Sequence, residues 1–255
     1  MRVEGKVVVV TGGASGIGRA MARRFKQEGA RAIVVADLNG DGAKQVAEEI
    51  GGRSFQVEVS RESDIVDLIE STEAECGPID LFCSNAGIGI GRGLDEPDVV
   101  WQKIWEVNVM SHVYAARNLI PRMIQRGGGY LLNTASAAGL LSQIGSVTYA
   151  VTKHAAVALA EWIAITHGHQ GIKVSVLCPQ AVRTAMTRGN EKGVASVDGM
   201  IEPEQLAETV IETLAEERFL VLPHPEVAEY IKRKGTDYDR WLRGMQRLAE
   251  QYRTS

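Results

Sequence analysis

Short β-branched runs alternate with segments of helical period along most of the chain, and this alternation restricts the possible folds more than any other feature. Val7–Thr11 is the first such run, and Ile17, Ala20, Met21 and Phe25 then follow at helical spacing. Patterns of this kind are typical of βαβ units, in which helices cover both faces of a parallel sheet. The sequence therefore predicts an α/β fold built on a parallel sheet.

The alternation continues through the middle of the chain. We expect further strands at residues 32–36, 55–59, 79–84, 130–134, 173–177 and 219–222, and long helices at 101–125 and 148–167. Residues 186–202 are polar and contain glycine without a regular period, which predicts a mobile loop on the substrate side. A helical extension is expected over residues 223–255.

A chain of 255 residues, 45% of them hydrophobic, is long enough to bury one substantial core. No internal repeat or flexible linker divides the sequence, so we expect a single domain over residues 1–255. An apolar stripe at helical spacing runs through the predicted extension and comprises Trp241, Leu242, Met245, Leu248, Ala249 and Tyr252. Such a stripe must be covered, and we expect it to serve either as a lid or as a subunit interface.

Net charge and cysteine content limit the partners. The formal net charge is −4 and the pI is near 5.8, which disfavours nucleic acid and favours a small-molecule substrate. No stretch reaches the ~18 apolar residues of a membrane span, so we expect no membrane partner and a cytoplasmic location. The three cysteines lack metal-ligand spacing, which predicts a reducing compartment and no catalytic metal.

A glycine-rich turn, TGGASGIG at residues 11–18, joins the first predicted strand to the first predicted helix. Glycines permit a tight turn there, and the free N–H groups and dipole of the helix start attract phosphate. The pattern predicts that a pyrophosphate contacts Gly12, Ser15, Gly16, Ile17 and Gly18.

Asp37 ends the second predicted strand, 19 residues after Gly18. A carboxylate about 20 residues after the glycine turn accepts hydrogen bonds from the adenosine ribose hydroxyls and repels a 2′-phosphate. Leu38 and Asn39 follow Asp37 and offer no cation to hold such a phosphate. These residues favour NAD over NADP as the cofactor.

Taken together, the motifs resemble those of the short-chain dehydrogenase/reductase family. The glycine turn is joined by SNAG at residues 84–87, by Asn108, by Ser136 and by YAVTK at residues 149–153, and the resemblance extends over residues 5–184. It implies a Rossmann-like, doubly wound sheet of seven parallel strands in the order 3-2-1-4-5-6-7. It also implies a homotetramer or homodimer formed through the two long helices.

By the same resemblance, the cofactor is expected to contact residues well beyond the glycine turn. These are Leu38, Glu58, Val59, Asn85, Ala86, Gly87, Tyr149, Lys153, Pro179, Val182 and Thr184. The chain departs from the family pattern at Glu58, where aspartate is usual, and at Gln180, where glycine is usual. Gln180 adds a side chain to a cramped turn, and it either shapes the substrate pocket or alters the loop that closes over it.

Tyr149 and Lys153 lie four residues apart on a predicted helix, so their side chains emerge from one face. A neighbouring ammonium favours the phenolate, and we therefore expect a lowered pKa for Tyr149 and a role as general acid and base. The resemblance implies that Ser136 hydrogen-bonds the substrate oxygen and that Asn108 holds a water leading to Lys153.

The residues expected near the substrate by resemblance are mostly apolar: Ile88, Ile90, Ala138, Leu140, Gln143, Ile144, Ala181 and Met186. They favour a secondary alcohol or ketone on a hydrophobic skeleton, unless they merely pack against one another. The sequence thus predicts an NAD-dependent oxidoreductase. An NADP-dependent carbonyl reductase of the same fold and a catalytically silent NAD-binding sensor or scaffold are the alternatives.

Overall fold

The computed structural model describes residues 1–189 and 191–253. Within this part of the chain, seven strands form one sheet in the order β3-β2-β1-β4-β5-β6-β7, and every neighbouring pair is parallel. The strands are β1 (Val7–Thr11), β2 (Ala32–Asp37), β3 (Arg53–Gln56), β4 (Leu81–Ser84), β5 (Gly129–Thr134), β6 (Ile172–Leu177) and β7 (Leu220–Val221). The predicted fold class and strand order are confirmed.

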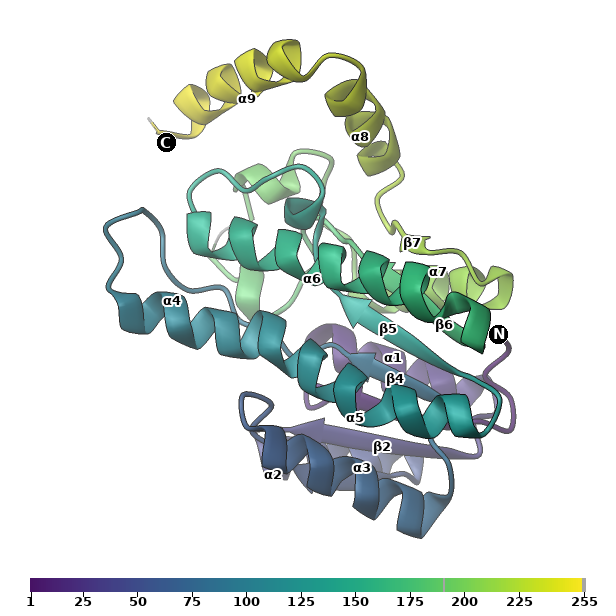
Figure 1. Cartoon of the computed structure of the whole chain (residues 1–255). Coiled ribbons are helices and arrows are strands. Elements are labelled where there is room, and N and C mark those ends of the chain that lie inside the picture. The colour runs from purple at the N-terminus through teal and green to yellow at the C-terminus, as the bar shows by residue number, and fades with distance from the viewer. Residues whose placement is uncertain (190, 254–255) are drawn as a thin grey trace.

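Helices cover both faces of the sheet (Figure 1). One layer consists of α3 (Glu62–Cys76), α5 (Ser111–Gln125) and α6 (Val147–His167), and the other of α1 (Gly16–Gln27), α2 (Gly40–Ile50) and α7 (Pro203–Glu216). In β1, Val7 and Val9 join the core under the first layer, whereas Val8 and Val10 join the core under the second. Because side chains alternate along a strand, a strand buried on both faces reads as an unbroken apolar run.

Some predicted strand boundaries were wrong. β3 ends at Gln56, whereas the sequence predicted a strand over residues 55–59. Val57 and Val59 are buried, but they pack in the core after the strand has ended. An apolar pattern shows which residues are buried but not which residues pair with a neighbouring strand. For this reason the strand was predicted too far along the chain.

The predicted long helix at 101–125 is interrupted. It consists of α4 (Asp98–Trp105), a π-helical turn (Glu106–Met110) and α5. Asn108 lies in the π-helical turn and is fully buried. Such turns insert an extra residue into a helix and often occur at functional sites, and the apolar period of the sequence does not reveal them.

The predicted loop at 186–202 is largely irregular among its described residues, and residue 190 lies outside them. It contains the short 3₁₀ turns Ala185–Thr187 and Val194–Ser196, and Val182 and Ile201 form an isolated parallel bridge across its base. Two further 3₁₀ turns are Ala137–Gly139 and Gly168–Gln170.

The predicted extension holds two helices, α8 (Glu226–Thr236) and α9 (Tyr238–Arg253), and its last two residues lie outside the described part of the chain. Figure 1 shows these two helices, coloured olive to yellow, standing apart from both helical layers. Over residues 1–189 and 191–253, no helix is both long enough and apolar enough to cross a membrane.

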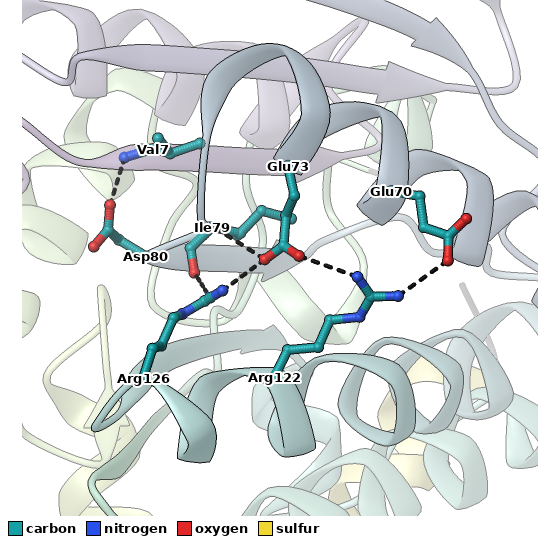
Figure 2. Close-up of polar contacts among 7 residues, drawn as sticks. All are labelled: Val7, Glu70, Glu73, Ile79, Asp80, Arg122 and Arg126. Carbon is teal, nitrogen blue, oxygen red and sulfur yellow. Dashed lines mark hydrogen bonds and ion pairs between the residues drawn. The ribbon is translucent and has the colours of Figure 1, made fainter.

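A polar cluster joins α3 to α5 close to the first residues of β1 and β4 (Figure 2). Glu73 of α3 accepts hydrogen bonds from Arg122 at 3.1 Å and from Arg126 at 2.6 Å, both on or directly after α5. Arg126 also donates to the backbone oxygen of Ile79, and Asp80 accepts from the backbone N–H of Val7 at 2.8 Å. These contacts fix the two helices and the start of β4 relative to β1.

Candidate active site

A cavity of about 970 Å³ opens where the carboxyl ends of the central strands meet the turns that follow them. In doubly wound sheets, this edge is where ligands bind. Every residue predicted from the sequence to touch the cofactor lines this cavity: Gly12, Ser15, Gly16, Ile17, Gly18, Asp37, Leu38, Glu58, Val59, Asn85, Ala86, Gly87, Tyr149, Lys153, Pro179, Val182 and Thr184.

The glycine turn leads directly into α1, whose first N–H groups lie free of side-chain caps. Ser15 precedes the helix in an extended conformation without a side-chain capping bond, and the first turn carries no acidic residue. Gly18 packs so closely that a Cβ there would lie 2.2 Å from the backbone oxygen of Gly12. The turn therefore presents backbone donors and a positive helix end to the cavity, as a pyrophosphate requires.

Asp37 is held between the second strand and the glycine turn. One carboxylate oxygen accepts from the N–H of Ala14 at 3.0 Å, and the other accepts from the N–H of Asn39 at 2.9 Å. Further along the cavity, Glu58 accepts from the Ser60 hydroxyl at 2.7 Å and forms an ion pair with Lys103 at 3.5 Å. The Ser60 bond, aided by Lys103, lowers the pKa of Glu58.

Asn85 ties the three central strands together beneath the cavity. Its side-chain amide donates to the backbone oxygen of Thr11 at 3.0 Å, and its own side-chain oxygen accepts from the Thr134 hydroxyl at 3.1 Å. The Thr11 hydroxyl in turn accepts from the backbone N–H of Asn85 at 3.0 Å. Thr11 and Thr134 are supporting residues that the sequence reasoning missed, although Thr11 opens the glycine motif.

Ser136, Tyr149 and Lys153 come together at the other end of the cavity. Tyr149 and Lys153 lie one turn apart on α6, and the Lys153 Nζ lies 5.5 Å from the centre of the Tyr149 ring. Lys153 is buried and donates to the backbone oxygen of Thr134 at 3.0 Å. The Ser136 hydroxyl accepts from the N–H of Ala138 at 3.1 Å, which orients it in the turn after β5.

Burial dominates the electrostatics of this cluster. It raises the pKa of Tyr149, and the Ser136 hydroxyl only partly opposes this effect. Burial also lowers the pKa of Lys153 to about 8. The sequence predicted a lowered pKa for Tyr149, and this was wrong because desolvation of the phenolate raises the pKa by more than the Ser136 hydroxyl lowers it.

Asn108 lies behind the cavity wall and does not line it. Its side-chain oxygen accepts from the N–H of Ile88 at 2.9 Å, and its amide donates to the Ile88 oxygen at 2.9 Å and to the Thr152 hydroxyl at 3.3 Å. The side chain thus fixes the segment that follows β4. Its expected role as a water anchor stays a prediction.

Six of the eight residues predicted near the substrate line the cavity: Ile88, Ala138, Gln143, Ile144, Ala181 and Met186. Ile90 and Leu140 do not line it. Leu140 packs against the core, and the backbone oxygen of Ile90 accepts a hydrogen bond from the Thr148 hydroxyl. The sequence reasoning missed Tyr230 of α8 as a lining residue. Trp241, Met245 and Leu248 of α9 also line the cavity, and their apolar spacing was the signal that pointed to them.

Comparison with known proteins gives consistent results. A family model described as short chain dehydrogenase matches residues 6–195. The 1-deoxy-11-beta-hydroxypentalenate dehydrogenase of Streptomyces exfoliatus is 35% identical over 237 residues, which cover 89% of this chain and 86% of the relative. Epidermal retinol dehydrogenase 2 of Homo sapiens is 29% identical over 232 residues, which cover 87% of this chain and 75% of the relative.

Among solved structures, a short chain dehydrogenase/reductase from Burkholderia phymatum in complex with NAD superimposes with a TM-score of 0.86 at 26% sequence identity. The superposition covers 94% of this chain and 96% of that protein. The structural similarity therefore extends over nearly the whole length of both chains.

Proposed function

The chain belongs to the short-chain dehydrogenase/reductase family and is an oxidoreductase acting on CH–OH groups, and we propose that it interconverts a secondary alcohol and a ketone with NAD. One continuous cavity joins the glycine turn and Asp37 to the cluster of Ser136, Tyr149 and Lys153. This continuity is the observation that supports the proposal most strongly, because a nucleotide bound at the glycine turn and Asp37 would reach the Tyr149 phenol, the proposed proton donor. The proposed substrate is a small molecule with a mainly apolar skeleton.

The residues of the cavity fit a nicotinamide dinucleotide. Uncapped N–H groups at the start of α1 suit a pyrophosphate, and the Asp37 carboxylate, oriented by two backbone donors, suits two ribose hydroxyls. When bound, the nicotinamide accepts or supplies the hydride.

In this proposal, Tyr149 carries the proton. Because burial raises its pKa, the phenol is protonated near neutral pH and is ready to donate to a carbonyl oxygen during reduction. The Ser136 hydroxyl donates a hydrogen bond to the same oxygen as negative charge develops there. Lys153, as an ammonium beside the ring, stabilises the phenolate that remains, and in oxidation the proton returns to Tyr149 from the alcohol.

Asp37 is the residue that favours NAD over NADP. The cations lining the cavity are Arg92, Lys103 and Lys153, of which Lys103 is paired with Glu58 and Lys153 lies beside Tyr149. A 2′-phosphate would meet the Asp37 carboxylate, and repulsion between the two anions disfavours NADP. An NADP-dependent carbonyl reductase is the second candidate, and a comparison of the two cofactors distinguishes them. The cytoplasmic location, the single domain and the assembly as a homotetramer or homodimer stay predictions.

Turnover of secondary alcohols tests the proposal. We expect the wild-type chain to reduce NAD in the presence of hydrophobic secondary alcohols, measured by the absorbance of the reduced cofactor. Tyr149→Phe should lower kcat/KM at least about 100-fold while cofactor binding is retained. Tyr114→Phe is a matched control, since Tyr114 lies on α5 outside the cavity. Cofactor binding without turnover in the wild type would favour the silent sensor, and faster turnover with NADP would favour the carbonyl reductase.

A further inference from the structure

The two helices of the C-terminal extension supply an apolar surface to the cavity. Trp241, Met245 and Leu248 follow one another at spacings of four and three residues, so they occupy one face of α9, and all three line the cavity. Leu242 belongs to the same helix but does not line the cavity and is 42% exposed. The apolar stripe predicted from the sequence is therefore divided, with one part directed to the site and another to solvent.

Polar contacts hold α8 against the turns that border the site. Asp198, on the loop at 186–202, accepts from the Gln180 side-chain amide at 2.9 Å and from the Tyr230 hydroxyl of α8 at 2.9 Å. The backbone N–H of Gln180 donates to Nδ1 of His224, which is buried just before α8 begins. Gln180 occupies the position where the family usually has glycine, and glycine has no side chain to make the bond to Asp198.

A second anchor lies closer to α9. Lys234, near the end of α8, donates to the backbone oxygen of Leu140 at 2.7 Å, which joins the extension to the segment after β5. The same ammonium lies 5.0 Å from the centre of the Trp241 ring. This contact is within the range of a cation–π interaction, and it helps to fix the ring that lines the cavity.

We propose that α9 forms the outer wall of the substrate pocket and that Trp241, Met245 and Leu248 select bulky, uncharged, apolar alcohols and ketones. The inference rests on the proposed function and assigns the substrate class of that site. A molecule that contacts both Tyr149 and Trp241 must fill the space between them, which is lined by apolar side chains such as Ile144 and Met186. Such a molecule binds more tightly because it buries its own apolar surface and that of the α9 wall, whereas a short alcohol leaves the wall exposed to water.

Selectivity between a bulky and a short secondary alcohol tests the wall. The probes are cyclododecanol and 2-propanol, and the measured quantity is the ratio of their kcat/KM values. We expect the wild type to favour cyclododecanol and Trp241→Ala to lower this ratio about ten-fold or more. Leu242→Ala is the matched control on the outer side of the same helix. It should show the same ratio of kcat/KM values and the same activity as the wild type. Equal effects of the two substitutions would overturn the inference.

Lys234 provides a test of positioning. Lys234→Met removes the bond to Leu140 and should raise KM for cyclododecanol while kcat is retained, and Lys234→Arg should restore the lower KM. A fall in kcat alone, or no rescue by arginine, would contradict the positioning role.

Two further measurements distinguish a pocket wall from a subunit interface and from a failure of the proposed function. If Trp241→Ala changed the oligomeric state in light scattering but left the selectivity ratio intact, the α9 surface would be a subunit interface and the inference would be wrong. If neither alcohol were turned over with NAD or NADP, the proposed function would fail, and calorimetric binding of cyclododecanone would decide the inference. Weaker binding to Trp241→Ala than to Leu242→Ala would support the wall, and equal binding would refute it.

Discussion

His112, in the first turn of α5, is buried, and neither of its ring nitrogens has a hydrogen-bond partner among the described residues. Burial, together with the nearby charge of Lys153, lowers its pKa to about 3, and the neighbouring Asn133 side chain opposes this only weakly. The folded chain therefore keeps this imidazole neutral over a pH range in which the unfolded chain binds a proton.

The sign of the effect follows from proton linkage. Below the unfolded pKa of about 6.5, the unfolded state binds a proton that the folded state does not bind. The free energy of unfolding therefore decreases as the pH is lowered, until the pH reaches the folded pKa of about 3. One pKa unit corresponds to about 1.4 kcal/mol, and His112 alone should therefore lower the free energy of unfolding by about 2 kcal/mol between about pH 7 and about pH 5.

Urea unfolding of the wild type and of His112→Leu at these two pH values measures the effect. Leucine fills a similar volume and does not titrate. His224, whose pKa is also lowered by burial, titrates in both proteins and cancels in the comparison. The loss of stability on acidification should be smaller in His112→Leu by about 2 kcal/mol at equal protein concentration. The same loss in both proteins would show that His112 is not held neutral by the fold.

Three further perturbations test the nucleotide site and the core. Replacing Asp37 with Ala and Leu38 with Arg should raise kcat/KM for NADP relative to NAD, because the repelling carboxylate is lost and a cation is gained; an unchanged ratio of the two would contradict the ribose assignment. Gly18→Ala places a Cβ 2.2 Å from a backbone oxygen of the same turn, so the affinity for NAD measured by calorimetry should fall about ten-fold or more. Gly168→Ala is the control, because there is open space around its new methyl group, and it should bind NAD as tightly as the wild type does. Glu73→Ala leaves Arg122 and Arg126 without their shared carboxylate and should lower the free energy of urea unfolding by about 1–3 kcal/mol, and a loss below about 0.5 kcal/mol would mean that the cluster in Figure 2 contributes little to stability.

The sequence by itself determined the parallel sheet and the family resemblance, and that resemblance implied the strand order. Strands buried on both faces leave continuous apolar runs, and the glycine turn, Asp37 and the pair Tyr149 and Lys153 occur in one register along the chain. These features are local or depend on fixed spacing, so they can be read without coordinates. The glycine-turn residues and Asp37 were predicted from this register, whereas the other cofactor-facing residues were implied by the family resemblance. All of them line the cavity.

Other features were decided by the tertiary structure alone. β3 ends earlier than its apolar pattern predicted. A strand ends where its pairing with the neighbouring strand ends, whereas an apolar pattern shows only which residues are buried. The pKa of Tyr149 moves upward, since the cost of burying a phenolate depends on everything packed around it and not on the spacing to Lys153.

The surroundings of α9 illustrate the same limit. Its apolar face was visible in the sequence, but whether that face covered a pocket or another subunit was not, because periodicity shows only that a face must be covered. The contacts from Asp198 to Gln180 and Tyr230 join residues 18 and 32 positions away along the chain. Contacts across such distances depend on how the whole chain folds, and only the folded chain brings these side chains together beside the pocket.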